Sequence, residues 1–163
     1  MRVGIGWDLH RLAKGKRFLL GGVLLKSAAG PVGHSDGDVL THAVIDALLG
    51  AAGAGDIGEH FPDTDARWRG ASSVAMLRKV VRLLAGKGWR VSNIDTVVCL
   101  EAPKLTPYKA AIRTKLAGVL GVASGDVSVK AKTAEGLGPI GQNKAVSATC
   151  VALIESRVSR RKK

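Results

Sequence analysis

The chain has 163 residues, of which 46% are hydrophobic, so it is long and apolar enough for one folded domain with a buried core and not for a disordered segment. Its net charge of +12 indicates an anionic partner, which could be nucleic acid, an anionic membrane or a phosphorylated small substrate. Only 4% of the residues are aromatic, which argues against a surface on which nucleic-acid bases stack. Cys99 and Cys150 stand far apart, which excludes a disulfide framework or a thiolate zinc site.

The N-terminus reaches a charged residue before an apolar stretch of signal-peptide length develops. No stretch approaches the roughly eighteen uninterrupted apolar residues that a membrane span needs. We therefore expect a soluble, cytoplasmic protein with no membrane partner. Residues 1–155 are expected to form one domain, and residues 156–163 a basic, flexible tail.

Strand-like and helix-like segments alternate along the chain. Apolar alternation or short apolar runs predict strands at Val3–Trp7, Phe18–Leu25 (interrupted by two glycines), Arg90–Leu100, Val127–Lys132 and Ala145–Ile154. Helical spacing of apolar residues predicts helices at Asp38–Ala51, Ser72–Ala85 and Pro107–Leu120. This order predicts an α+β fold, an α/β sandwich in which helices pack on one face of a mixed sheet.

Asp8 and His10 follow the first strand, two residues apart, and in an extended chain such residues point to the same side. His42 lies one turn into the first predicted helix. One carboxylate and two imidazoles suit zinc and leave a coordination position open. Asp46, one turn after His42, is placed to orient that imidazole. Spacing alone leaves open that Asp8-Leu9-His10 is a chance tripeptide and His42 a polar helix residue.

Three further segments allow two interpretations each. His34 and Ser35 either donate hydrogen bonds to a phosphate beside the metal or merely precede a helix capped by Asp36 or Asp38. Carboxylates crowd the loop from Asp56 to Asp65 and either bind a vicinal diol or form Asx turns. The third comprises residues 102–104 and 130–135. Either its Lys104 and Lys132 bind phosphate and its Glu135 helps to hold a divalent ion, or all three lie on solvated surface.

Two glycine-rich segments match the dinucleotide pattern G-x-G-x-x-G, at 53–58 and 136–141. The first follows a predicted helix, and the second contains Pro139 and is expected to open a strand. Neither lies between a strand and a helix, so neither predicts a dinucleotide site.

Taken together, these motifs resemble the family of 2-C-methyl-D-erythritol 2,4-cyclodiphosphate synthases over roughly Arg2 to Glu155. The resemblance is carried by ordered segments at matching intervals: 4–10, 20–23, 34–38, His42, 46–50, 55–58, 61–65, 102–104 and 130–138. It implies cyclisation of 4-diphosphocytidyl-2-C-methyl-D-erythritol 2-phosphate with release of CMP, in the non-mevalonate route to isoprenoid precursors. It also implies a homotrimer whose active sites lie between subunits.

The resemblance assigns roles to residues. Zinc ligands are implied at Asp8, His10 and His42. Because the attacking phosphate is already ionised and needs no protein base, we assign His34 and Thr133 to transition-state stabilisation through hydrogen bonds. The phosphate and methylerythritol positions are Asp8, His10, His34, Ser35, Asp56, Ile57, Gly58, Phe61, Pro62, Asp63, Thr64 and Asp65. The cytidine and diphosphate positions are Leu100, Ala102, Pro103, Lys104, Leu105, Thr106, Ala131, Lys132, Thr133, Ala134 and Glu135, of which Glu135 helps to hold magnesium or manganese.

The sequence departs from the better-known bacterial pattern between the last two predicted strands. Lys132-Thr133-Ala134-Glu135 replaces Thr-Thr-Thr-Glu, and Pro139 and Gln142 replace a phenylalanine and a phosphate-binding arginine. We hypothesise that Lys132 supplies the lost charge. The same replacements argue against binding of an isoprenoid diphosphate in a trimer cavity, which some family members show at those positions.

Three alternatives compete with this interpretation. A zinc-dependent phosphohydrolase would use the same ligands with a water nucleophile and give a ring-opened product. A nucleic-acid-binding domain would show salt-sensitive binding, and the basic tail is its main support. An inactive structural trimer would leave the shared histidine and aspartate motifs without explanation.

Overall fold

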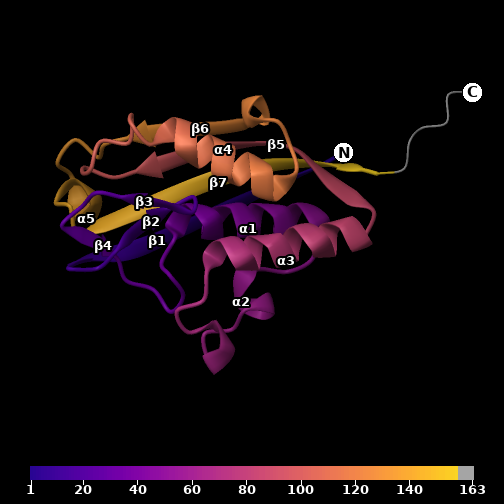
Figure 1. Cartoon of the computed structure of the whole chain (residues 1–163), viewed down its shortest axis with the longest axis horizontal. Coiled ribbons are helices and arrows are strands. Elements are labelled where there is room, and N and C mark those ends of the chain that lie inside the picture. The colour runs from indigo at the N-terminus through magenta and orange to yellow at the C-terminus, as the bar shows by residue number, and fades with distance from the viewer. Residues whose placement is uncertain (158–163) are drawn as a thin grey trace, which may run out of the picture.

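The structure is a computed structural model and describes residues 1–157 (Figure 1). Its strands are β1 (Arg2–Lys14), β2 (Phe18–Leu20), β3 (Val23–Leu25), β4 (Ala29–Pro31), β5 (Trp89–Cys99), β6 (Val127–Lys132) and β7 (Ala145–Ser156). Its helices are α1 (Val39–Ala52), α2 (Ile57–His60), α3 (Ser73–Gly86), α4 (Lys109–Leu120) and α5 (Gly138–Gly141), with 3-10 turns at Ala66–Trp68 and Ser124–Asp126.

Five strands form the main sheet in the order β4-β1-β7-β5-β6, and β2 and β3 form a separate hairpin. β5 and β6 are parallel, whereas the other neighbours in the main sheet are antiparallel. The predicted mixed sheet and α+β class are therefore confirmed. Figure 1 shows α1, α3 and α4 on one face of this sheet, where side chains such as Leu48, Leu77, Ile112 and Ile154 are fully buried.

Two glycines bring β1 and α1 unusually close together. A Cβ atom at Gly6 would lie 2.1 Å from the carbonyl oxygen of Ala43, and one at Gly4 would lie 2.1 Å from that of Ala47. No side chain fits into either space, so only glycine permits this backbone contact. The contact lays α1, from Ala43 to Ala51, directly against the backbone of β1 at Gly4 and Gly6.

Asp38 ties the start of α1 to the β2–β3 hairpin. Its buried carboxylate caps the helix by accepting a hydrogen bond from Thr41 N at 3.0 Å, and it also accepts from Gly21 N at 2.8 Å and Gly22 N at 2.6 Å. Of the two predicted caps, Asp36 and Asp38, Asp38 is the one used. The two glycines have positive φ angles of 58° and 74°, and their turn splits the predicted Phe18–Leu25 run into two strands.

Several predicted boundaries are wrong for identifiable reasons. The first strand continues to Lys14, because pairing with β7 and β4 extends it beyond the apolar alternation. Pro107 precedes α4, which begins at Lys109 after Tyr108. The second glycine-rich segment ends in the short helix α5 instead of opening a strand, since Pro139 fits a first helical turn, where no N–H is needed.

The C-terminal boundary also differs. Ser156 belongs to β7, and Arg157 N donates a hydrogen bond to Gly88 O at 2.8 Å, so the expected tail does not begin at residue 156. The rest of that prediction, residues 158–163, lies outside the described residues. Within the described range, the structure contains no helix of sufficient length and apolar character to traverse a membrane.

The sheet face opposite the helices carries an exposed apolar stripe. Its exposed stripe consists of β1 and β7 side chains that are between 42% and 70% exposed, namely Val3, Ile5, Trp7, Leu9 and Val151. None of the described helices covers this stripe, and Ile5 and Val151 are direct cross-strand partners. A continuous apolar stripe of this kind is typical of a protein interface.

Candidate functional site

Asp8, His10 and His42 converge on one point between β1 and α1. Asp8 Oδ2 lies 3.0 Å from His10 Nε2 and 2.9 Å from His42 Nδ1, and the two ring nitrogens are 3.1 Å apart. Asp8 and His10 lie inside β1, not after it, and their i, i+2 spacing puts both on the side that faces α1. One oxygen and two nitrogen donors in a cluster of this size fit a zinc ion.

The charge and the burial of Asp8 are also those of a metal ligand. Burial raises the pKa of Asp8, but hydrogen bonds and charge from His10 and His42 outweigh it and hold that pKa well below its usual range. Asp8 is therefore a carboxylate at neutral pH, as a metal ligand must be. Burial raises the pKa of Cys150 to about 12, so this thiol stays protonated and supplies no competing thiolate ligand.

The second nitrogen of His42 is held by hydroxyl groups. His42 Nε2 lies 2.8 Å from Ser73 Oγ and 3.0 Å from Ser35 Oγ. Asp46, predicted to orient this ring, instead accepts a hydrogen bond from Ile57 N at 2.8 Å and so ties α1 to α2. Sequence reasoning missed Ser73 as a site residue, because nothing in the pattern relates it to a histidine 31 residues earlier.

A cavity of about 370 Å³ opens beside the triad. Its lining includes, besides the candidate ligand His42, eight predicted site residues, namely His10, His34, Ser35, Ile57, Gly58, Phe61, Pro62 and Asp63. His34 Nε2 is buried and has no hydrogen-bond partner among the described residues, so it is available to a ligand. Trp68 and Met76 also line the cavity and were not predicted; only the rarity of a tryptophan in a charged loop could have drawn attention to Trp68.

Two carboxylates of the acidic loop do not line this cavity. Asp56 caps α2 by accepting from Glu59 N at 3.0 Å, and Asp65 caps the 3-10 turn and forms an exposed ion pair with Arg67. These contacts are those of the Asx-turn interpretation. Thr64 also lies outside the cavity lining, whereas Asp63 and Pro62 belong to it. A role of Asp56, Thr64 or Asp65 toward a ligand stays a prediction.

A second, smaller cavity of about 160 Å³ joins the two segments predicted to bind cytidine. It is lined by Leu100, Glu101, Pro103, Lys104, Leu105, Thr106, Lys109, Ala131, Lys132 and Thr133. The parallel pairing of β5 with β6 brings these segments together, because Cys99 pairs with Lys132 and Leu100 N donates to Lys132 O at 3.0 Å. Ala102, Ala134 and Glu135 adjoin this cavity in sequence but do not line it.

Glu101 organises the loop that follows β6. Its Oε1 atom accepts hydrogen bonds from Ala134 N at 2.9 Å and Gly136 N at 3.4 Å. The Thr133 hydroxyl donates a short hydrogen bond to Glu135, whose φ angle is +51°. Glu101 was not predicted as a site residue, because its hydrogen-bond partners are backbone groups that no side-chain pattern reveals.

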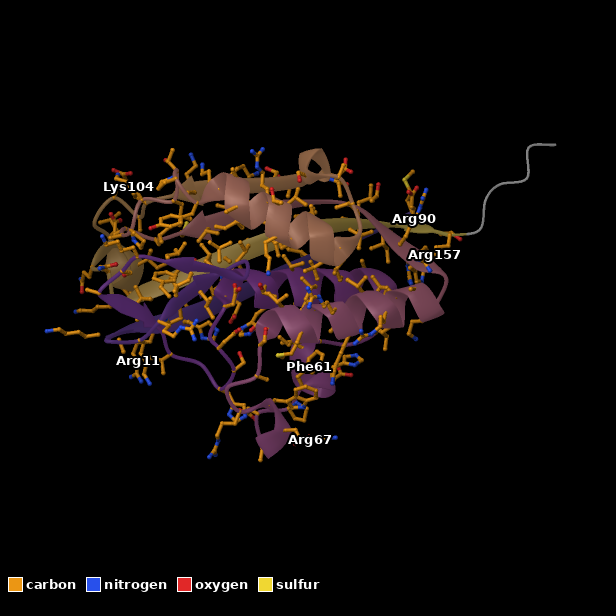
Figure 2. All side chains as sticks on the ribbon, viewed as in Figure 1. Arg11, Phe61, Arg67, Arg90, Lys104 and Arg157 are labelled. Atoms are coloured by element: carbon orange, nitrogen blue, oxygen red, sulfur yellow. The ribbon has the colours of Figure 1, made fainter. Side chains whose placement is uncertain are left out.

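The two cavities share no lining residue, and Figure 2 shows Phe61, at the first, well apart from Lys104, at the second. The predicted site residues of this chain are therefore divided between two separate cavities. A third cavity of about 670 Å³, near the labelled Arg90 and Arg157, has a lining that includes none of the predicted site residues. The volume of a cavity alone therefore does not identify the candidate site of this molecule.

Comparison with known proteins agrees with this geometry. A curated relative from Desulfosudis oleivorans, named 2-C-methyl-D-erythritol 2,4-cyclodiphosphate synthase, is 55% identical over 98% of this chain and 97% of its own. A solved structure of a 2C-methyl-D-erythritol-2,4-cyclodiphosphate synthase, in a CDP-bound form, matches with a TM-score of 0.88 at 40% identity, covering 94% of this chain and all of that one. The bifunctional IspDF from Campylobacter jejuni matches with a TM-score of 0.91 at 37% identity over 95% of this chain, which spans 42% of that longer chain.

The match to the YgbB family extends over residues 1–155, which include every described element except the last residue of β7. The expected resemblance to the 2-C-methyl-D-erythritol 2,4-cyclodiphosphate synthases is thereby confirmed. This chain belongs to the YgbB family.

Proposed function

We propose that this enzyme cyclises 4-diphosphocytidyl-2-C-methyl-D-erythritol 2-phosphate to the 2,4-cyclodiphosphate and releases CMP, as a step toward isoprenoid precursors. The observation that carries the proposal is the cluster of Asp8, His10 and His42 beside the cavity of His34, in a chain whose relatives bear the synthase name. The substrate 2-phosphate attacks the β-phosphorus, the bond from that phosphorus to the bridging oxygen breaks, and CMP leaves with the oxygen.

Zinc is the metal proposed for Asp8, His10 and His42, because a carboxylate and two imidazoles that leave a position open are its usual ligands at a catalytic site. When bound there, zinc would offset negative charge on the β-phosphate and favour the approach of the second phosphate. The nucleophile is already ionised, so the chain supplies neither a covalent nucleophile nor a general base. Magnesium or manganese on the diphosphate, held with the help of Glu135, is the second proposed ion.

The chain's own polar groups are proposed to hold the phosphates and the methylerythritol. His34 Nε2 is a buried nitrogen at the cavity without a hydrogen-bond partner among the described residues, and Ser35 adds a hydroxyl. The other groups proposed for this part are Asp56, Ile57, Gly58, Phe61, Pro62, Asp63, Thr64 and Asp65. Removal of one such transition-state donor costs on the order of 3 kcal/mol in enzymes where it has been measured.

The smaller cavity is proposed to bind the cytidine and its adjoining phosphate. It combines Lys104 and Lys132 with the Thr133 hydroxyl, and one of the similar solved structures is a CDP-bound form. Lysine ammonium groups attract phosphate as point charges. Thr133 is the second proposed transition-state donor.

A homotrimer with active sites between subunits is proposed for the assembly. The exposed stripe of β1 and β7 supports contact between copies, since a second copy would bury its apolar area. The separation of the two cavities supports an active site shared between subunits. One substrate would need groups from both cavities, which two neighbouring subunits can bring together. The number three rests on the resemblance to the family.

The proposal is tested by His42→Ala. This variant should lose stoichiometric zinc and slow CMP release by roughly 100-fold or more, since one of three ligands is missing. Metal analysis of the purified protein and a CMP-release assay measure the two effects. His60→Ala is the control for zinc content, because His60 Nε2 faces Ala54 O at 2.7 Å and lies outside the triad.

Three results would contradict the proposal. Stoichiometric zinc with full turnover in His42→Ala would remove the ligand assignment. Loss of zinc from His60→Ala to the same extent would remove the evidence that zinc depends on His42 as a ligand. A ring-opened phosphate as the product of the unmodified enzyme would indicate attack by water and hence a phosphohydrolase.

A further inference from the structure

Behind the triad, a buried chain of hydrogen bonds connects His42 to a carboxylate that does not reach the triad. Ser73 is fully buried, and its Oγ lies 2.8 Å from His42 Nε2. The Ser73 hydroxyl donates a short hydrogen bond to Asp36 Oδ1, and Ser73 N donates to Asp36 Oδ2 at 3.0 Å. Asp36 thus holds both the backbone and the side chain of Ser73.

The direction of these hydrogen bonds follows from counting protons. A serine hydroxyl carries one proton, and here it is donated to Asp36, which as a carboxylate can only accept. Ser73 Oγ can therefore only accept from His42, so the imidazole proton lies on Nε2. His42 Nδ1 then keeps its lone pair, and this is the atom that faces Asp8 and His10.

We propose that Ser73, fixed by Asp36, is a positioning residue that holds His42 in the tautomer and orientation needed to bind the metal through Nδ1. The inference rests on the proposed zinc centre and adds to it a partner that metal-ligand spacing does not reveal. Ser35 Oγ, at 3.0 Å from the same Nε2, faces the cavity, whereas Ser73 lies in the protein interior. The constant partner of His42 is therefore Ser73.

Ser73→Ala tests the proposal, and Ser72→Ala is its matched control. Both remove one hydroxyl at the start of α3, but Ser72 Oγ is exposed and accepts only from Ala75 N in the described structure. With zinc alone as the probe, competition against a chelator should show 10- to 100-fold weaker binding by Ser73→Ala, the usual effect of removing such a partner, and unchanged binding by Ser72→Ala. Circular dichroism should show both variants folded.

A second measurement reports on the ring itself. In zinc-loaded protein, long-range ¹H–¹⁵N NMR should show the His42 proton on Nε2, exchanging slowly with solvent in the unmodified protein and in Ser72→Ala and rapidly in Ser73→Ala. Unchanged zinc affinity in Ser73→Ala would overturn the inference. If that variant does not fold, a His42 Nε2 proton that exchanges freely in the unmodified protein overturns it instead. Failure of the unmodified protein to bind zinc would contradict the proposed function itself.

Discussion

At the scale of single residues, Lys132 is the proposed replacement for a positive charge that the family pattern places elsewhere. It ends β6 and lines the smaller cavity together with Lys104 and Lys109. Gln142, at the position where the family pattern has an arginine, lies outside that cavity and accepts a hydrogen bond from Lys144 Nζ at 2.8 Å. The cavity thus has its positive charge on β6, on α4 and on the loop between β5 and α4, which supports Lys132 as the replacement for the missing arginine.

Lys132→Ala should weaken the binding of substrate and of CDP about tenfold, since a charge-assisted contact contributes roughly 1.5 kcal/mol. Steady-state CMP release gives KM and kcat, and calorimetry gives the Kd of CDP. Lys87→Ala is the control, because Lys87 is exposed at the end of α3. Unchanged KM, kcat and Kd in Lys132→Ala would show that Lys132 does not replace the lost arginine.

At the scale of elements, the packing of α1 on β1 builds the candidate metal site. Asp8 and His10 come from β1 and His42 from α1, so their distances depend on how closely these elements pack. That closeness depends in turn on Gly6, where a Cβ would lie 2.1 Å from one backbone atom of α1 and 2.6 Å from another. A glycine that binds no ligand therefore sets the geometry of the ligands.

Gly6→Ala should move α1 away from β1 and both destabilise the fold and weaken zinc binding. Overpacking of a tight core costs about 1–3 kcal/mol, which chemical denaturation can measure, and a separate titration gives the zinc affinity. Gly118→Ala in α4 is the control, since its Cβ would meet nothing within 4 Å and alanine favours a helix. Wild-type stability and zinc affinity in Gly6→Ala would show that the contact is not needed.

Sequence patterns predicted the elements whose signals are local. Apolar periodicity located α1, α3 and the long strands, and the i, i+2 spacing of Asp8 and His10 predicted their shared face. The helix α2 and the strand β4 were missed because four and three residues are too few for a period. Ser73 and Glu101 were missed for another reason: their partners, His42 and Ala134, lie 31 and 33 residues away, and only the folded chain brings them together.

At the scale of the whole molecule, two features support contact between copies of this chain. They are the exposed stripe on the sheet and the division of the predicted site residues between two cavities. Helices cover one face, while the exposed stripe on the other leaves Ile5 70% exposed. The three metal ligands lie within one chain, whereas the cavity of Lys104 is separate from theirs. In the proposed assembly, zinc binding would therefore need one subunit, and turnover would need two.

Ile5→Glu separates these two requirements. A carboxylate in the middle of the apolar stripe opposes contact between copies, because its burial without a partner costs several kcal/mol, on the order of the cost of any unpaired buried charge. The variant should sediment as a smaller species, keep stoichiometric zinc and lose CMP release. Leu24→Glu, on the separate β2–β3 hairpin and 54% exposed, is the control and should keep the assembly. A fully active single subunit would show that one chain closes the site alone, and an assembled Ile5→Glu would show that copies meet through another face.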